Sequence, residues 1–241
     1  MFILRGGSFK IICAIFGSFD KNMYDVLMAA NADRGNFAYS HCIYGKNNTP
    51  FHVNKFDKII NPDDVKDLDS NIFYCGHYQA PTSSARKWKA ETSHPFEHGN
   101  WIVAHNGVIT NVEELQQKYA PESKIIVDSN IIPMLLTHFD TDASDAQVPN
   151  EIAVKLALEK ICGTFAVWII NTKTKRCFIA RQGSTLFLNS KTGSFSSVEC
   201  KSSGWMKAIE GYVYEIDLKK KAVAIVSKIE SNNSPFMFIP G

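Results

Sequence analysis

The sequence of 241 residues predicts an α+β layered domain rather than a doubly wound sheet. Its 45% hydrophobic, 12% aromatic and 21% charged residues match an average globular protein and exclude a fully disordered chain. Many short apolar stretches of strand character occur along the chain, and a few helical stretches are segregated between them. Neither a long repeat nor a low-complexity tract interrupts this pattern.

The first expected elements are a strand and a helix. Residues 9–16 form an apolar run rich in Ile and Phe, which predicts a buried strand closed by Gly17. Residues 20–32 follow with apolar side chains near helical spacing. Further strands are expected at residues 72–78, 101–104, 165–170, 177–180, 186–188, 212–218 and 222–227.

Two later helices have recognisable boundaries. Asn111, with Glu114 three positions on, is typical of a capping box at the start of a helix over residues 112–119. Asn150 begins a helix that reaches residue 161 and ends at Gly163. The polar segment 140–150 between them is the best loop or linker candidate, but we do not divide the chain there.

Charge and cysteine usage restrict the partners and the compartment. The 26 basic and 24 acidic side chains leave a net charge of +2, so we expect neither nucleic acid nor a membrane surface as partner. The six cysteines form no C-x-x-C pair, which favours a reducing, cytoplasmic location and predicts no metal site. The first residues lack the pattern of a signal peptide, and no apolar run approaches the roughly 20 residues of a membrane span.

No glycine-rich nucleotide-binding signature is present, which argues against kinases and dehydrogenases. Instead, polar clusters follow the apolar strands in a fixed order. They are Cys13–Gly17, Asp33–Gly35, Cys75–Thr82, Ser93–Phe96, His105–Asn111 and Asp128–Asn130.

In this order and spacing the clusters resemble the glutaminase domain of class II glutamine amidotransferases, which are N-terminal-nucleophile hydrolases. That family shows Cys-Gly-Ile-Phe-Gly, R-G, G-H-x-R-x-x-T, H-P, H-N-G-x-I-x-N and D-[ST]-E. The resemblance continues through Gly163–Ala166, Ala180–Arg181 and Ser197–Glu199, so it covers nearly the whole chain. It implies a four-layer αββα sandwich of two antiparallel sheets, with no metal and no organic cofactor.

The resemblance implies that Cys13 is the nucleophile, activated by its own α-amine, and that Asn106 and Gly107 form the oxyanion hole. Each position has an alternative interpretation. A cysteine in an apolar strand is often a small buried hydrophobe. An Asn-Gly pair between apolar runs is typical of a type I′ hairpin turn, although a turn is also able to present amides to a ligand.

Glutamine recognition is assigned by the same resemblance. Asp128 matches the carboxylate that holds the substrate's α-ammonium group, with a helix N-cap as the alternative. Thr82 and His94 match positions near the substrate carboxylate, although His94 is also suited to a structural hydrogen bond. Arg34 matches an arginine beside the nucleophile, or complements a helix C-terminus. His77 and His105 are interpreted as structural partners.

The sequence departs from the family in two places that matter for activity. Twelve residues precede Cys13, so its nitrogen is an amide unless the bond between Ile12 and Cys13 is cut. Gln79 stands where the family has the arginine that clamps the glutamine carboxylate, which replaces a bidentate cation by a neutral amide. Short stand-alone proteins of bacteriophage genomes look similar in carrying Gln-Ala-Pro-Thr at this point.

We therefore expect residues 1–12 to be an extension or propeptide and residues 13–241 a single amidotransferase-like domain. The expected function is hydrolysis of the glutamine side-chain amide, with ammonia passed to a separate synthase subunit because the chain ends where the glutaminase domain ends. Two alternatives stay open. One is a catalytically inactive amidotransferase fold with a structural or binding role, and the other is an amide hydrolase for a different substrate.

Overall fold

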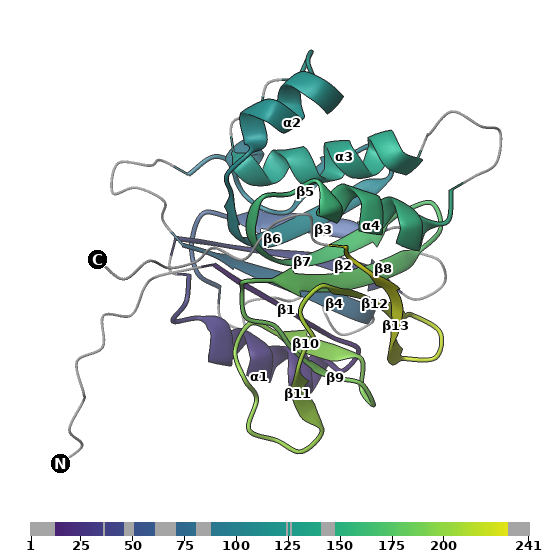
Figure 1. Cartoon of the computed structure of the whole chain (residues 1–241). Helices are drawn as coiled ribbons and strands as arrows, with labels where there is room; N and C mark the ends of the chain where they lie inside the picture. Colours follow the sequence, from purple (N-terminus) through teal and green to yellow (C-terminus); the bar gives the residue numbers. More distant parts are fainter. Residues whose placement is uncertain are drawn as a thin grey trace, which may run out of the picture.

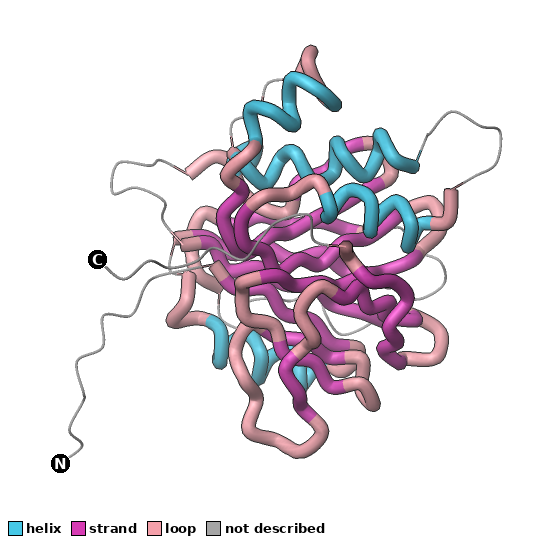
Figure 2. Tube along the Cα trace, in the orientation of Figure 1, coloured by secondary structure: helices cyan, strands magenta, loops and turns pink. Residues whose placement is uncertain are grey.

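A computed structural model describes residues 13–35, 37–45, 51–60, 71–80, 88–123, 125, 127–140 and 148–230. The described chain forms four layers, in which two antiparallel sheets lie face to face and helices cover both outer faces (Figure 1). The tube in Figure 2 shows the strands gathered in the middle and the helices on the outside. This confirms the α+β layering predicted from the sequence and the αββα sandwich that the family resemblance implies.

The first sheet, sheet A, contains seven strands in the order β11-β9-β10-β1-β4-β2-β3, and its neighbouring strands pair antiparallel. The strand nearest the predicted nucleophile, β1, is the fourth of the seven, so it is hydrogen-bonded on both sides. The bounds are β1 Ala14–Ser18, β2 Ala38–Gly45, β3 His52–Phe56, β4 Asn71–Gln79, β9 Phe187–Asn189, β10 Ser194–Ser196 and β11 Trp205–Lys207.

The second sheet, sheet B, contains six antiparallel strands in the order β13-β12-β8-β7-β6-β5. Its longest pairing joins β6 to β7 from Trp101 opposite Asn171 to Ile109 opposite Gly163. The bounds are β5 Phe96–His98, β6 Trp101–Ile109, β7 Gly163–Asn171, β8 Arg176–Gln182, β12 Tyr212–Asp217 and β13 Ala222–Lys228.

The helices are divided between the two outer faces. Helix α1 (Lys21–Asn31) lies on sheet A, whereas α2 (Val112–Tyr119), α3 (Ile131–Asp140) and α4 (Asn150–Glu159) lie on the side of sheet B. Two 3₁₀ turns, η2 (Ala90–Thr92) and η3 (Asp128–Asn130), precede β5 and α3. Asp20 caps α1 by accepting the Met23 N–H over 2.7 Å, which explains why the helix begins there.

Three apolar cores follow from this layering. One core lies between the sheets, with Ile15, Phe73 and Trp168 among its buried members. A second joins α1 to sheet A, and the third joins α2, α3 and α4 to sheet B. Strands buried on both faces have nearly continuous apolar sequences, which is why β1 and β7 are recognisable from sequence alone.

The element predictions were partly correct. The helices over 112–119 and 20–32 are confirmed, as are the seven strands expected after the first one. Of the first expected strand, residues 14–16 lie in β1, and residues 9–12 lie outside the described part. The capping box at Asn111 is wrong: its Oδ1 accepts the Cys162 N–H and its Nδ2 donates to Lys160 O, so this side chain joins α2 to the end of α4. The hairpin-turn alternative for Asn106-Gly107 is also wrong, because both residues lie within β6.

Candidate active site

Cys13 directly precedes β1, and its side chain is partly exposed. The backbone N–H of Ala80, the residue after β4, donates to Cys13 Sγ over 3.4 Å. A backbone donor that faces a sulfur favours the thiolate, which is the nucleophilic form. The predicted nucleophile therefore lies where solvent reaches it and where a donor already faces its sulfur.

Arg34 brings a positive charge to the same place. It follows α1, and its Nη1 donates to Thr185 Oγ1 and to the Ser197 carbonyl, both over 3.1 Å. Its Nε and Nη2 are buried without a hydrogen-bond partner in the described part of the chain. Burial lowers the pKa of the Arg34 guanidinium, and the adjacent Cys13 sulfur opposes that shift. The same interaction, taken from the sulfur's side, stabilises the Cys13 thiolate.

Gln79 ends β4 on the opposite side of Cys13 from β10. In the register of β1 and β4, Ala14 lies opposite Tyr78, so Cys13 falls next to Gln79 across the sheet. The Gln79 side chain is 3% exposed, and its Nε2 donates to the Thr92 carbonyl over 3.4 Å. Its Oε1 accepts no hydrogen bond from any residue that the structure describes.

Asn106 and Gly107 lie in β6, opposite Ala166 and Phe165 of β7. The Asn106 side chain is 3% exposed, and its Nδ2 donates to Ser197 Oγ over 3.3 Å. A Cβ on residue 107 would lie 2.0 Å from the Thr164 carbonyl oxygen, so only glycine fits there. The tight pairing with β7 explains why the Asn-Gly pair continues the strand instead of turning.

The backbone N–H of Gly107 is directed away from β7. The Thr110 N–H donates to the Cys162 carbonyl, and hydrogen bonds to one neighbour alternate along an antiparallel strand. The amides of residues 107 and 109 therefore point to the other edge of β6, where the Ile109 N–H donates to Asp128 Oδ2 over 2.9 Å. Strand β5 pairs with β6 only between residues 101 and 103, so it does not reach Gly107.

Ser197 joins the two sheets at this point and is absent from the residues proposed from sequence as site residues. Its Oγ accepts the Ile15 N–H over 3.0 Å and the Asn106 Nδ2–H over 3.3 Å, and its own N–H donates to the Ile15 carbonyl. Ile15 and Asn106 lie 182 and 91 residues away in sequence. The resemblance of Ser197–Glu199 to a family segment was the one signal in the sequence, but only the fold shows what its hydroxyl contacts.

Asp128 opens η3 and is hydrogen-bonded to β6, the strand that carries Asn106 and Gly107. Its Oδ2 accepts the Ile109 N–H, and its Oδ1 accepts the Ser129 N–H over 2.8 Å. The side chain is partly exposed, and helix α3 begins three residues later. Asp128 therefore places a carboxylate beside the edge of β6 to which the Gly107 amide points.

Three buried histidines, His77, His94 and His105, lie close to one another beside the site. The rings of His77 and His94 lie 4.1 Å apart, and His77 Nε2 donates to the His105 carbonyl over 3.3 Å. His105 Nε2 donates to the Thr164 carbonyl, so its Nδ1 accepts the Ser129 hydroxyl over 2.8 Å. Burial lowers the pKa of His77 to about 3 and lowers that of His105, against the opposing charge of Asp128. His77 and His105 are thus neutral structural partners, as predicted.

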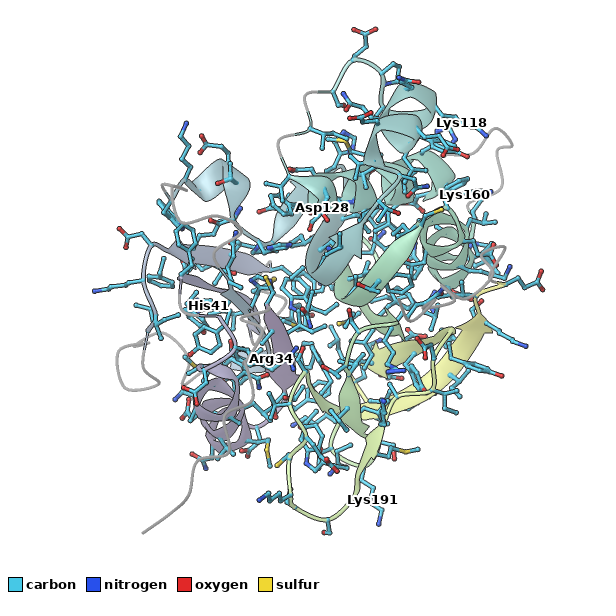
Figure 3. The ribbon with its side chains drawn as sticks, turned by 60° about the vertical axis from the view of Figure 1, so that its left-hand side comes forward. Arg34, His41, Lys118, Asp128, Lys160 and Lys191 are labelled. Carbon is cyan, nitrogen blue, oxygen red and sulfur yellow. The ribbon has the colours of Figure 1, made fainter. Side chains whose placement is uncertain are left out.

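The structure therefore brings together most of the residues proposed from sequence. Cys13, Arg34 and Asn106 are linked through Ser197 and its neighbours, Gln79 lies beside Cys13, and Asp128 adjoins β6. In Figure 3, Arg34 lies on the side of α1 and Asp128 on the side of α3, so they come from opposite layers. Thr82 lies outside the described residues.

Metal sites and membrane spans are both absent from the described residues. They contain no group of three or more His, Cys, Asp or Glu side chains arranged to hold a metal ion. None of their helices is long and apolar enough to cross a membrane. All six cysteines lie among the described residues, and none of them forms a disulfide.

Sequence comparisons agree with this arrangement. Residues 87–199 match the family described as glutamine amidotransferase domain. The chain is 33% identical over 126 residues to 7-cyano-7-deazaguanine synthase of Saccharolobus solfataricus, covering 52% of this chain and 26% of that protein. It is 27% identical over 177 residues to 7-cyano-7-deazaguanine synthase 2 of Sulfurisphaera tokodaii, covering 70% of this chain and 36% of that protein. It is 27% identical over 143 residues to glutamine–fructose-6-phosphate aminotransferase of Listeria monocytogenes, covering 57% of this chain and 22% of that protein. The chain thus spans between 22% and 36% of the length of these relatives.

Solved structures share the fold. Glutamine phosphoribosylpyrophosphate amidotransferase from B. subtilis superposes with a TM-score of 0.66 at 15% identity, covering 91% of this chain and 50% of that one. A glutamine aminotransferase class-II domain protein from Silicibacter pomeroyi gives a TM-score of 0.53 at 13% identity, covering 91% and 100%. Residues 87–199 therefore match the glutamine amidotransferase domain family, and the described chain has the fold of class II glutamine amidotransferases of the N-terminal-nucleophile type.

Proposed function

We propose that this chain hydrolyses the side-chain amide of glutamine, with Cys13 as nucleophile, and delivers the ammonia to a separate acceptor enzyme. The observation that carries the proposal is the placement of Cys13 Sγ against the Ala80 N–H and the Arg34 guanidinium. Ser197 links the strand after Cys13 to Asn106, so the nucleophile and an amide donor are held by one hydrogen-bond network.

The first chemical step forms a bond between Cys13 Sγ and the side-chain carbonyl carbon of glutamine. The thiol proton passes to the α-amine of Cys13, and the carbonyl oxygen becomes an oxyanion. The second Nδ2 proton of Asn106 and the Gly107 N–H are the donors for this oxyanion. A donor of this kind contributes about 100- to 1000-fold to kcat in enzymes where it has been removed.

The intermediate then collapses. The carbon–nitrogen bond breaks, the α-ammonium of Cys13 returns its proton to the leaving nitrogen, and ammonia departs. Water attacks the resulting thioester, with the α-amine again accepting a proton, and glutamate and the free thiol are regenerated. Asp128 is positioned to accept the α-ammonium group of the substrate, while Thr82, His94 and Gln79 are assigned to its carboxyl end.

This mechanism needs a free α-amine on Cys13. We propose that the bond between Ile12 and Cys13 is cleaved and that residues 13–241 act as a single domain. The α-amine has an ordinary pKa of about 8, which suits proton transfer near neutral pH. An amide nitrogen has no comparable basicity, so the chain with residues 1–12 attached is expected to be an inactive precursor.

The acceptor of the ammonia is proposed to be a separate synthase. The relatives named as 7-cyano-7-deazaguanine synthases and as an aminotransferase match this chain over only part of their length. That partial match supports a nitrogen-donating part that works with a distinct acceptor part. Cysteines that form no disulfide are consistent with a reducing cytoplasm, which we retain as the proposed location.

The test is ammonia and glutamate release from glutamine by the wild-type protein that begins at residue 13, and by its Cys13→Ala and Cys200→Ala variants. Cys200 is a matched control because it is also a partly exposed cysteine but contacts Ser202 outside the site. We expect Cys13→Ala to abolish release and Cys200→Ala to retain the wild-type rate. Equal rates for wild type and Cys13→Ala would remove Cys13 from the mechanism.

A second candidate function is a binding or structural protein with an inactive amidotransferase fold. It is favoured by Gln79 in place of the arginine and by the residues that precede Cys13. Intact mass of the protein from its native source separates the two functions. A permanent bond between Ile12 and Cys13, with no ammonia release, would support the inactive form.

A further inference from the structure

Gln79 carries an unused hydrogen-bond acceptor beside the nucleophile. The side chain is 3% exposed, and its Oε1 has no partner among the residues described. Buried polar atoms without a partner are uncommon in folded proteins, and each one indicates strain or a missing ligand. Because Gln79 falls next to Cys13 across the sheet, that ligand would be the substrate.

The orientation of the Gln79 carboxamide is fixed by its other end. The Thr92 carbonyl only accepts, so the atom that faces it at 3.4 Å is the Nε2 donor and not the oxygen. The segment that carries Thr92 is itself held, because Lys55 Nζ donates to the Ala90 and Ser93 carbonyls over 3.1 and 2.9 Å. If the Gln79 carboxamide were turned over, its Oε1 would face the Thr92 carbonyl oxygen, and two acceptors would then repel each other.

This arrangement suits an amide better than a carboxylate. A carboxylate offers acceptors only, so it would leave Gln79 Oε1 unpaired and place like partial charges against each other. An amide group offers both an N–H for Oε1 and a carbonyl oxygen for the remaining Nε2 proton. The two carboxamides would then pair at two points.

Arg34 does not replace the missing cation on this side of the site. Its Nη1 bonds lead to Ser197, which follows β10, and to Thr185, which precedes β9. Strands β10 and β4 flank β1 on opposite sides. The guanidinium therefore reaches toward the β10 side of Cys13, whereas Gln79 lies on the β4 side.

We propose that Gln79 makes this site select substrates in which the α-carboxyl group of glutamine is itself an amide, above all an N-terminal glutaminyl residue of a peptide. This inference rests on the proposed function, since it assigns the substrate class of the same Cys13-dependent hydrolysis. The free α-amine of such a residue meets Asp128, its side-chain amide meets Cys13, and its peptide N–H meets Gln79 Oε1. The products are ammonia and the corresponding N-terminal glutamyl peptide.

The experiment compares glutamine with glutaminyl-glycine as substrates of the purified protein whose chain begins at Cys13, with ammonia measured and glutamyl-glycine identified by mass. We expect kcat/KM for the dipeptide to exceed that for glutamine by about tenfold or more, as for a site that leaves a polar group unpaired with the wrong ligand. Gln79→Arg should reverse this preference. Gln117→Arg, which adds the same charge on the exposed face of α2, should leave it unchanged.

A second variant guards against misfolding of Gln79→Arg. Gln79→Met has a similar volume but no hydrogen-bonding groups, so it should reduce the ratio of the two kcat/KM values toward one while the chain stays folded. A wild-type preference for glutamine, with release still dependent on Cys13, would overturn this inference and leave the proposed function intact. Release from neither substrate would overturn both.

Discussion

Arg176 and Arg34 have opposite environments, and the difference distinguishes an arginine that stabilises the fold from one that we assign to the reaction. Arg176 on β8 donates through Nε and Nη2 to both carboxylate oxygens of Glu215 over 2.7 Å, donates through Nη1 to Glu151, and lies 5.0 Å from the Phe178 ring centroid. Arg34 has two neutral acceptors and two unpartnered nitrogens among the described residues. The hydrogen bonds that Arg176 donates to Glu215 raise the pKa of Arg176, whereas burial lowers the pKa of Arg34.

The charge of Arg176 is neutralised by the protein itself, so its contribution is to hold α4 against β8 and β12. The charge of Arg34 has no carboxylate partner among the contacts that the structure describes. The Cys13 sulfur opposes the effect of burial on the pKa of Arg34, so the proposed thiolate is the partner charge that we assign to this guanidinium. A buried charge that the fold leaves unneutralised is costly, and such sites are typical of function.

Exchanging each arginine for methionine is the strongest test of this comparison. In Arg34→Met the Cys13 thiol should be harder to ionise, so its alkylation by iodoacetamide at pH 7 and its ammonia release should fall by about tenfold or more. Arg176→Met should retain both rates but lose roughly 1 to 2 kcal/mol of unfolding free energy, because two carboxylates lose their partner. Urea unfolding and alkylation rates measure the two effects. Equal alkylation of wild type and Arg34→Met would show that Arg34 does not act on the sulfur.

Replacing the buried Ser197 should have a smaller effect on the rate of ammonia release. Ser197→Ala removes the acceptor of Asn106 Nδ2 and of the Ile15 N–H, so Asn106, the proposed oxyanion donor, loses its orientation. We expect kcat to fall by about tenfold with little change in KM, because the interaction is needed only in the transition state. Ser40→Ala is the matched control, since Ser40 is 2% exposed and its Oγ has no hydrogen bond within the described residues. A rise in KM alone would assign Ser197 to substrate binding instead.

The loss of unfolding free energy at acid pH should come mainly from the buried histidines near the site. The pKa of His77 is lowered by burial to about 3, so the unfolded chain binds a proton that the folded chain does not. Stability is therefore complete above the ordinary histidine pKa of about 6.5 and is lost as the pH falls from there toward 3. In that range His77 alone contributes a slope of about 1.4 kcal/mol per pH unit.

The measurement is urea unfolding between pH 7 and pH 4 for wild type and His77→Gln. The variant should show a shallower fall in unfolding free energy with decreasing pH. His98→Gln, at an exposed position on β5, serves as the control and should keep the wild-type slope. Identical slopes for wild type and His77→Gln would contradict the assignment of a neutral His77.

Sequence alone predicted the fold where the strands are apolar. Strands β7 and β8 have nearly continuous runs of apolar residues, but β2 carries Ser40 and His41 at buried positions and was missed. His41 is accommodated by Tyr39 and Asn54, which hydrogen-bond its two ring nitrogens, and burial lowers its pKa to about 4. Asn54 comes from the neighbouring strand β3, and a partner of that kind is not visible in a local pattern. The three-residue strands β9, β10 and β11 are mostly too short for a periodic signal, so only β9 was expected.

The candidate site was predictable in its positions but not in its connections. The order of motifs along the chain is enough to indicate Cys13, Asn106 and Asp128. The bridging hydroxyl of Ser197 and the unneutralised charge of Arg34 depend on contacts between distant segments, which no spacing rule supplies. The unpaired oxygen of Gln79 likewise follows from where the Thr92 carbonyl lies.

The central claim is that Cys13 acts through its own free amine, and one measurement tests it most directly. The protein is treated with a glutamine-analogue electrophile, and its N-terminus and adduct are located by intact and peptide mass spectrometry. The account predicts a chain that begins at Cys13 and carries one adduct on that residue. A working protein that hydrolyses amides while residues 1–12 stay attached and Cys13 stays unlabelled would contradict it.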